Sequence, residues 1–242
     1  MKVSIITVCK NSGSCIERAI RSVVDQTYEG IEYIIIDGGS QDNSVEIFDR
    51  YADHIDILVS EPDTGIYNAM NKGLDRCSGE IVYFLNSDDY LFDDQVVADV
   101  AGAFKENADM QLLYGNILVA GPRTKTIVAY PDISRPYFYK NTICHQAIFA
   151  KKALFDRIGR FDETYVIHAD TDWLLRVYFK MREAMIYMDR TVCVFSTGGI
   201  CGDPVSAEQY KYDRQEISAK YFWEARIKLF IKKLLLKAGI EV

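Results

Sequence analysis

The chain has 242 residues, of which 49% are apolar and 26% charged, and its 35 acidic residues against 28 basic ones give a formal net charge of −7. This length and composition exclude a disordered or collagen-like chain and predict one large domain, or one domain with a small appendage. The acidic balance argues against a protein that coats nucleic acid through a general basic surface.

The first eight residues form a largely apolar run, Met-Lys-Val-Ser-Ile-Ile-Thr-Val. This run is too short to span a bilayer, and no small-residue cleavage pattern follows it. We therefore expect neither a signal peptide nor a transmembrane helix, and we expect the protein to stay in the cytosol.

The first hundred residues alternate short apolar runs with segments of helical spacing. Continuous apolar runs are typical of strands that a parallel sheet buries on both faces. A Ser-Cys-Ile-Glu capping-box pattern at 14–17 marks the start of the first helix. The further elements predicted in this half are strands at 2–8, 31–36, 55–60 and 81–85 and helices at 43–51, 67–77 and 95–105. This order predicts an α/β, doubly wound fold.

Beyond residue 110 the alternation loosens. A turn at 121–123 separates two strand-like runs and favours their antiparallel pairing, so the complete sheet should be mixed. The elements predicted here are strands at 111–119, 126–130, 185–187 and 192–195 and helices at 151–158 and 170–180.

No linker-like stretch or internal repeat divides the chain. We predict one domain over residues 1–219, with halves at 1–109 and 110–219, followed by a helical tail at 220–242.

Polar residues follow four consecutive predicted strands, at 9–11, 37–42, 61–65 and 86–89. Ligands of open parallel sheets bind beyond the carboxyl ends of the strands. Turn and capping preferences explain single residues, such as Asp42 or Asn43 before the second helix, better than the whole set. Because Asp88 and Asp89 would repel each other at an apolar strand end, they suggest a hard divalent cation.

Two common nucleotide-binding motifs are missing from the sequence. There is no G-x-G-x-x-G after the first strand and no G-x-x-x-x-G-K-[ST]. A dinucleotide-binding dehydrogenase and a P-loop nucleotide hydrolase are therefore excluded. A bound nucleotide would need the cation to neutralise its phosphates.

The strand-end motifs, taken in order, closely resemble those of family 2 glycosyltransferases with the GT-A fold. The resemblance covers residues 2–92 and extends more loosely through His145-Gln146, Asp170-x-Asp172-Trp173-x-x-Arg176 and Gly198-Gly199. The motifs that carry it are Thr-Val-Cys-Lys-Asn at 7–11, Ile-Asp-Gly-Gly-Ser-x-Asp at 36–42, Glu-x-Asp-x-Gly-Ile-Tyr-x-Ala-Met-Asn-Lys-Gly at 61–73 and Phe-Leu-Asn-Ser-Asp-Asp at 84–89.

The resemblance implies an enzyme that moves a sugar, with inversion, from a nucleoside diphosphate sugar to an acceptor hydroxyl. Residues 1–109 would bind the donor, UDP- or dTDP-linked by family habit, and 110–219 the acceptor. The acceptor would be a saccharide or a lipid-linked precursor in surface polysaccharide or glycolipid biosynthesis.

The resemblance also assigns the donor side. Asp37 matches the position that hydrogen-bonds the nucleobase, and Asp63 the one that reaches the base or ribose. Asp88 and Asp89 match the region that holds Mg²⁺ or Mn²⁺ against the diphosphate, and Asn86, where an Asp often stands, leaves open which of the two ligates directly. The full set of expected donor-binding residues is Thr7, Cys9, Asn11, Asp37, Asp63, Asn71, Lys72 and Asp88.

On the acceptor side, Asp170 matches the catalytic base, although Ala169 replaces the usual preceding Glu. Asp172 is the rival base, and an ordinary helix start is the structural alternative for Asp170. The residues expected near the acceptor are His145, Gln146, Asp172 and Trp173. The segment at 195–200 is expected either to close over the diphosphate or to form a plain glycine turn.

The tail at 220–242 carries six basic residues against two acidic ones, a local charge of +4 that leaves −11 for the remainder. Its aromatic and aliphatic residues lie among the lysines, as in helices that bind an anionic membrane. Such a tail would hold the protein at the inner face of the cell membrane. The alternative is a helix packed on the core or on a second subunit in a homodimer.

Two other functions stay open from the sequence. A sugar-1-phosphate nucleotidyltransferase would share the α/β core, but residues 9–13 match its glycine-rich activating loop poorly. A nucleotide-sugar-binding scaffold with a degenerate site would explain Asn68, Asn86 and Ala169.

Overall fold

The computed structural model describes residues 1–197, 207–224, 226–227, 230–231 and 234. Within them one nine-stranded sheet runs in the order β3-β2-β1-β4-β8-β6-β9-β5, and β7 pairs with β6. The strands are β1 (Val3–Cys9), β2 (Ile31–Asp37), β3 (Ile57–Ser60), β4 (Ile81–Asn86), β5 (Tyr90–Leu91), β6 (Leu112–Ala120), β7 (Lys125–Val128), β8 (Ile148–Lys151) and β9 (Met185–Ser196).

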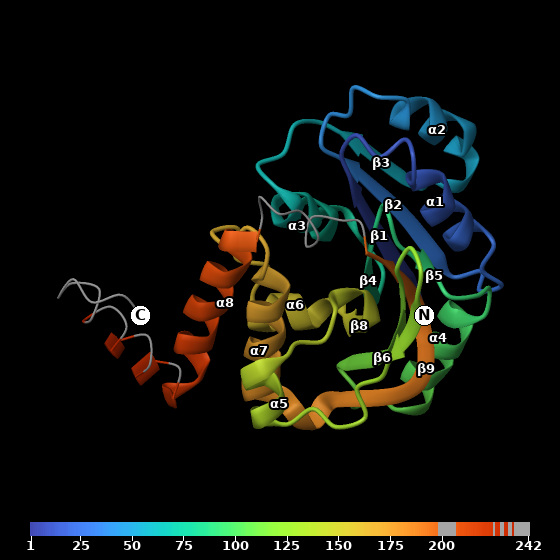
Figure 1. The fold of residues 1–242 in the computed structure, drawn as a ribbon. Coiled ribbons are helices and arrows are strands. Elements are labelled where there is room, and N and C mark those ends of the chain that lie inside the picture. Colours follow the sequence, from blue (N-terminus) through green and yellow to red (C-terminus); the bar gives the residue numbers. More distant parts are fainter. Residues whose placement is uncertain (198–206, 225, 228–229, 232–233, 235–242) are drawn as a thin grey trace.

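Helices cover both faces of this sheet, with α1 and α2 on one side of the parallel strands and α3 on the other (Figure 1). The α-helices are α1 (Ile16–Val24), α2 (Ser44–Arg50), α3 (Ile66–Arg76), α4 (Val96–Glu106), α5 (Arg135–Lys140), α6 (Lys152–Ile158), α7 (Ala169–Met181) and α8 (Ala207–Tyr221). The described residues also contain three 3₁₀ turns, η1 (Ala52–His54), η2 (His145–Ala147) and η3 (Arg182–Ala184).

The N-terminal half is parallel, as predicted. Strands β3, β2, β1 and β4 pair in parallel, and every residue of β1 is buried. The continuous apolar runs therefore reflect burial on both faces, and the doubly wound arrangement is confirmed.

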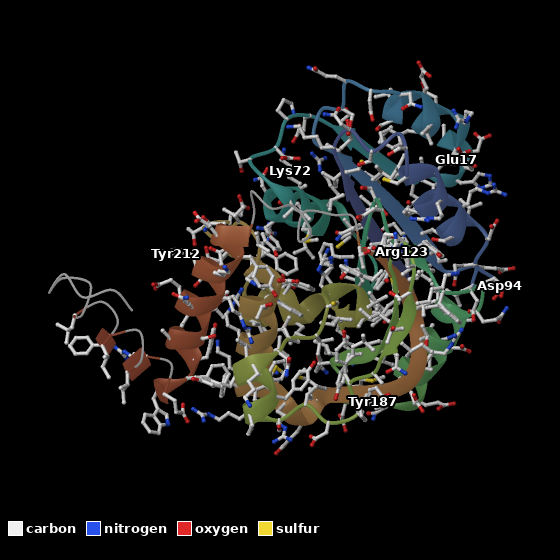
Figure 2. The ribbon with its side chains drawn as sticks, viewed as in Figure 1. Glu17, Lys72, Asp94, Arg123, Tyr187 and Tyr212 are labelled. Carbon is white, nitrogen blue, oxygen red and sulfur yellow. The ribbon has the colours of Figure 1, made fainter. Side chains whose placement is uncertain are left out.

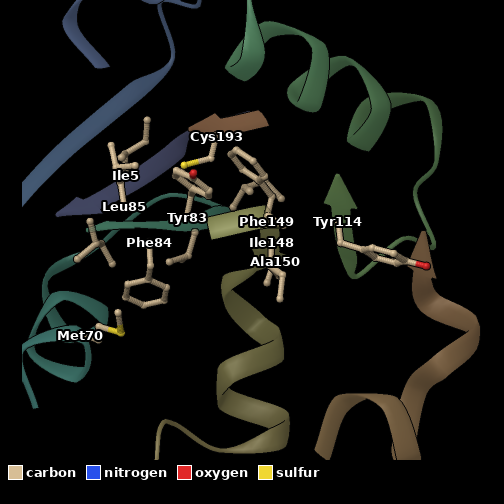
Figure 3. Close-up of a cluster of buried hydrophobic side chains, with 14 of the residues drawn as sticks. Ile5, Met70, Tyr83, Phe84, Leu85, Tyr114, Ile148, Phe149, Ala150 and Cys193 are labelled. Carbon is tan, nitrogen blue, oxygen red and sulfur yellow. The ribbon is translucent and has the colours of Figure 1, made fainter. Parts of the chain in front are cut away.

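The second half adds antiparallel pairs to this sheet, so the predicted mixed sheet is confirmed. β8 pairs antiparallel with both β4 and β6, and β6 and β7 form the predicted antiparallel pair. Where β4 meets β8, Tyr83 stacks on Phe149 with ring centroids 4.1 Å apart, beside Cys193 (Figure 3). This aromatic contact joins the parallel N-terminal strands to the second half of the sheet.

Two local predictions are wrong. The residues at 185–187 and 192–195 belong to one strand, β9, whose pairing with β6 shifts register near Asn116. The capping box is absent, because α1 has no side-chain cap at its start. Instead the Ser12 carbonyl accepts hydrogen bonds from the backbone N–H groups of Cys15 and Ile16, so a backbone turn satisfies these donors.

No helix of the described residues is long and apolar enough to cross a membrane.

Gly73 allows α3 to pack closely on β1. A Cβ atom at this position would lie 2.4 Å from Cγ2 of Ile6. We expect Gly73→Ala to lower the free energy of unfolding by about 1–3 kcal/mol, because the overpacking outweighs the better helix propensity of Ala. Urea unfolding followed by circular dichroism measures the change.

Gly102 in α4 is the matched control, because no atom lies within 4 Å of a Cβ built there. Gly102→Ala should raise the free energy of unfolding by about 0.5–1 kcal/mol. A Gly73→Ala protein at least as stable as the wild type would contradict the packing argument.

Candidate active site

The polar strand ends do meet at one edge of the sheet, as the parallel register requires. Cys9 pairs with Asp37 across β1 and β2, and Asp37 pairs with Ser60 across β2 and β3. On the other side of β1, Val8 pairs with Asn86. The loops that follow these strands therefore start from neighbouring points.

Asp37 is fully buried at the end of β2. Its carboxylate accepts hydrogen bonds from the backbone N–H of Ser40, at 3.0 Å, and from the hydroxyl groups of Ser40 and Ser60, the latter at 2.6 Å. The Cys9 thiol lies 3.8 Å away, and its burial raises its pKa. These bonds fix the carboxylate between two strand ends.

Asp63 reaches across to the segment that follows β2. One carboxylate oxygen accepts from the backbone N–H of Gly65 at 3.0 Å. The other lies 2.2 Å from where a Cβ atom of residue 38 would stand, so Gly38 is needed for this approach. Asp63 is half-buried, so this carboxylate retains access to solvent beside the end of β2.

The remaining predicted donor residues mainly hold loops in place. The Thr7 hydroxyl is buried 3.1 Å from that of Tyr33, and Asn11, at φ 51°, accepts from the Gln41 backbone N–H at 2.8 Å. The Asn71 side chain bonds both backbone groups of Phe161, and Lys72, labelled in Figure 2, pairs with Glu61 at 2.8 Å. Their side chains are thus engaged with the protein.

The adjacent aspartates after β4, Asp88 and Asp89, differ in burial and in hydrogen bonding. Asp89 is buried and accepts from Gln146 Nε2 at 2.6 Å and from the backbone N–H of Ser196 at 2.8 Å. Burial, with the charge of Asp88, raises the pKa of Asp89 to about 7. Asp88 is half-buried, and burial raises the pKa of its carboxyl too. Among the described residues, no side chain donates a hydrogen bond to the Asp88 carboxylate.

A chain of hydrogen bonds joins the predicted base to the end of β4. Oδ2 of Asp170 lies 3.1 Å from Nδ1 of His145, and Nε2 of His145 lies 3.3 Å from Oδ1 of Asn86. The Asn86 amide can serve either form of the imidazole, because it offers both a donor and an acceptor. The structure therefore brings Asp170, His145 and the Asp88 segment together.

Asp170 keeps its negative charge in this setting. Burial alone would raise its pKa, but the hydrogen bond and charge of His145 outweigh burial, and the pKa lies below its ordinary value. The Thr171 backbone N–H donates to Oδ1 at 2.7 Å, and the Tyr67 hydroxyl lies 3.2 Å from the same oxygen. The group is an ionised carboxylate fixed by three neighbours.

The side chains of Asp172 and Trp173 do not join this chain of hydrogen bonds and contact neighbouring helices instead. The Asp172 carboxylate is buried and binds Arg176 at 3.0 Å and Lys220 at 2.7 Å. The Trp173 ring stacks on Phe155 with centroids 4.3 Å apart. Both side chains hold helices together, and the glycine pair at 198–199 lies outside the described residues.

Arg18 and Ser196 also support this edge; Arg18 is not among the predicted site residues, whereas Ser196 lies in the segment at 195–200 that the sequence singled out. Arg18 Nη2 donates to the carbonyl of Asp88 at 2.8 Å, and the Ser196 hydroxyl donates to the same carbonyl at 2.7 Å. No sequence motif marks Arg18, since it lies on a plain amphipathic helix.

The described residues contain no group of three His, Cys, Asp or Glu side chains that could hold a metal ion alone. A cation bound mainly by substrate phosphates, water and one or two carboxylates does not need such a cage. The half-buried Asp88 carboxylate fits this role, and Asp170 fits that of a proton acceptor on the far side of His145.

Sequence comparison finds clear relatives. Residues 4–159 match the family described as "Glycosyl transferase family 2". A "PGL/p-HBAD biosynthesis glycosyltransferase" of Mycobacterium bovis is 31% identical over 212 residues, which cover 86% of this chain and 82% of that protein. An "Uncharacterized glycosyltransferase" of Mycobacterium tuberculosis is 32% identical over 202 residues, which cover 82% of this chain and 76% of that protein.

Solved structures share the fold. TarS 1–349 of S. aureus in complex with UDP-GlcNAc superposes with a TM-score of 0.75 at 19% identity, over 91% of this chain and 66% of TarS 1–349. Glucosyl-3-phosphoglycerate synthase of Mycobacterium tuberculosis, solved with Mn²⁺ and UDP, superposes with a TM-score of 0.62 at 19% identity, over 100% of this chain and 81% of that one. The chain spans 65% of the length of TarS 1–349 in a second structure of that protein. The predicted GT-A fold is confirmed.

Proposed function

Since the chain belongs to glycosyl transferase family 2, we propose that this glycosyltransferase is metal-dependent and inverting. The donor is a nucleoside diphosphate sugar, UDP- or dTDP-linked, and the acceptor is the hydroxyl of a saccharide or of a lipid-linked precursor of surface polysaccharide or glycolipid. One observation carries the proposal. The ionised carboxylate of Asp170 is joined through His145 to the segment that bears Asp88.

The donor lies across the ends of β1, β2 and β4. Structures of the same fold contain UDP, UDP-GlcNAc or GDP-Man, which supports a nucleotide sugar here. Asp63 faces the nucleoside with an accessible carboxylate, and Asp37, held by Ser40 and Ser60, lies on the base side. Because Asp37 is fully buried and its oxygens already accept from Ser40 and Ser60, it would support the base side by fixing the segment that follows β2.

Asp88 is the direct ligand of Mg²⁺ or Mn²⁺, and Asp89 holds the segment in place. The different surroundings of the two residues support this assignment, because both carboxylate oxygens of Asp89 already accept hydrogen bonds, from Gln146 and from the Ser196 backbone N–H. The bound cation supplies positive charge that stabilises the leaving nucleoside diphosphate. The half-buried Asp88 carboxylate, whose pKa burial raises, would also be stabilised by a nearby cation.

Asp170 takes the proton of the acceptor hydroxyl as that oxygen attacks the anomeric carbon. The bond from carbon to the diphosphate oxygen breaks on the opposite side, and the anomeric configuration inverts. His145 holds the Asp170 carboxylate through Nδ1, and its Nε2 lies within hydrogen-bond distance of the Asn86 side chain. Fixing the base in this way lowers the entropy cost of reaching the transition state.

The test is to incubate the purified protein with Mn²⁺ and a panel of nucleotide sugars and to measure nucleoside diphosphate release. Release that needs Mn²⁺ and depends on added acceptor is the expected result. Pyrophosphate release would indicate a nucleotidyltransferase, and nucleotide-sugar binding without turnover would indicate a scaffold.

The tail presents an apolar stripe that fits an anionic membrane surface at the inner face of the cell membrane. The described residues from 223 to 234 are helical. Each large apolar residue of the stripe is 49–64% exposed, and their spacing places them on one side of a helix, namely Trp223, Ile227, Phe230, Ile231 and Leu234. Lysines at 228, 232, 233 and 237 supply charge complementary to acidic headgroups.

We expect the protein to float with phosphatidylglycerol vesicles and much less with phosphatidylcholine vesicles. The double substitution Trp223→Ser and Phe230→Ser should abolish flotation, because it removes the largest stripe residues. Substitution is preferable to truncation near residue 219, since Lys220 and Tyr221 bind Asp172.

The matched control is Tyr212→Ser, which changes an aromatic residue that is 60% exposed on the outer side of α8 (Figure 2). This control should float like the wild type. Flotation of the double variant would refute the membrane proposal, and a dimer that this variant dissociates would identify a second subunit as the occupant.

A further inference from the structure

Helix α8 is fastened to the loop that leads to the predicted base. Asp213 of α8 is 1% exposed, and one of its carboxylate oxygens accepts from the backbone N–H groups of Val166 and Ile167, both at 3.0 Å. Its other oxygen accepts from Gln209 Nε2 at 2.6 Å. A buried carboxylate with these three donors fixes the loop firmly against α8.

Tyr67 of α3 contacts both this loop and the predicted base. The Tyr67 hydroxyl donates to the carbonyl of Ile167 and lies 3.2 Å from Oδ1 of Asp170. The backbone of Ile167 is therefore held by Asp213 on one side and by Tyr67 on the other. A shift of the loop would move the Tyr67 hydroxyl relative to the Asp170 carboxylate.

Two further attachments of α8 lie on the other side of Asp170. Lys220 Nζ and the Tyr221 hydroxyl bind the Asp172 carboxylate at 2.7 and 2.8 Å. Arg214 Nη2 donates to the carbonyls of Phe138 and Asn141, at 3.0 and 2.9 Å. The next residue, Thr142, accepts a hydrogen bond from Thr171 at 3.1 Å. Helix α8 thus contacts the chain before and after the base.

We propose that α8 is the element that positions the catalytic base, and that Asp213 is a positioning residue for Asp170 through Ile167 and Tyr67. The proposal rests on the role of Asp170 given above. Helix α8 lies beside α7 (Figure 1) and contributes none of the residues assigned to the donor or the metal. Its effect should therefore fall on the chemical step and leave donor binding intact.

The test compares kcat, donor KM and UDP affinity, in the presence of Mn²⁺, for the full-length wild type and Asp213→Ala. Because displacing a reacting group by about 1 Å can cost about 100-fold in rate, we expect kcat to fall about 30- to 100-fold. Donor KM and UDP affinity should stay at wild-type values. Asp213→Asn keeps an oxygen that can accept from both N–H groups, so it should restore most of the kcat.

Controls separate positioning from stability. Tyr212→Ala, on the exposed side of α8, should leave all parameters unchanged. Asp213→Ala combined with Asp170→Asn should be no slower than Asp170→Asn alone, because the base is already gone. If Asp213→Ala does not fold, Tyr67→Phe tests the same link and should lower kcat at unchanged KM.

A full kcat in Asp213→Ala, or in Tyr67→Phe where the former is unfolded, would overturn the inference, as would equal losses in kcat and UDP affinity. These results presuppose an active wild type. A wild type that releases no nucleoside diphosphate would instead refute the proposed function, so the two failures are distinguishable.

Discussion

Asp170→Asn should lower kcat by about 10³-fold, near the middle of the range for loss of a general acid or base. The amide has nearly the same shape, and it can still accept from the Thr171 backbone N–H, but it cannot take the acceptor proton. UDP affinity in the presence of Mn²⁺ should be unchanged, because the proposed donor site lies on the other side of His145 from Asp170. Steady-state kinetics and calorimetric UDP titration measure both quantities.

Asp172→Asn is the control that separates the two candidate bases. Its carboxylate binds Arg176 and Lys220 and is buried. Its replacement should lower the thermal midpoint, since two cations lose their partner, and should reduce kcat far less than Asp170→Asn does. If Asp172→Asn were the inactive variant and Asp170→Asn active, the assignment of the base would be wrong.

The pH dependence follows from the lowered pKa of Asp170. Because this pKa is lower in the folded protein, ionised Asp170 stabilises the folded state above its unfolded pKa, and this stability is lost as the pH falls toward the folded value. The lowered pKa also keeps the carboxylate ionised above about pH 5, so titration of Asp170 should produce no loss of kcat between about pH 5 and pH 8.

Much of the fold could be predicted from the sequence because the N-terminal strands are long, apolar and joined in chain order. β5 and β8 could not be, since they have two and four residues and pair with strands far away in the sequence. The single strand β9 was predicted as two pieces because its middle residues are only half-buried or exposed, which interrupts the apolar pattern. Short strands depend on tertiary pairing more than on local propensity.

The site shows the same limit at the level of single oxygens. The order of motifs predicted which strand ends gather, and the structure places those ends together. The order of motifs could not indicate that the Gln146 side chain and the Ser196 backbone N–H donate hydrogen bonds to the Asp89 carboxylate, because these residues lie 57 and 107 positions after Asp89. Nor could it indicate that Lys220 binds Asp172 from 48 residues away. Partners of buried carboxylates come from distant segments that no local pattern marks.

Family membership confirms the resemblance that the motifs carried. The division into halves at 1–109 and 110–219 stays a prediction. The structure nevertheless adds a reason to treat residues 220–222 with the preceding domain, since Lys220 and Tyr221 bind Asp172 and Phe222 is 1% exposed.

Asp88→Ala should lower Mn²⁺-dependent turnover by about 10²–10³-fold, the loss typical of removing one group that stabilises developing charge. The free energy of unfolding should be unchanged or higher, because burial of the Asp88 charge is unfavourable without a cation. Titrating Mn²⁺ against turnover, with and without a chelator, measures the loss.

Asp89→Asn is the matched variant one residue away. An amide at 89 keeps an oxygen for the Ser196 backbone N–H and removes a buried charge that the folded state disfavours, which offsets the loss of the Gln146 hydrogen bond. We therefore expect a thermal midpoint no lower than that of the wild type and a Mn²⁺ dependence close to that of the wild type. A folded Asp89→Asn protein that does not respond to Mn²⁺, together with a fully active Asp88→Ala protein, would make Asp89 the direct ligand. Full activity in both variants would remove the metal from this edge of the sheet altogether.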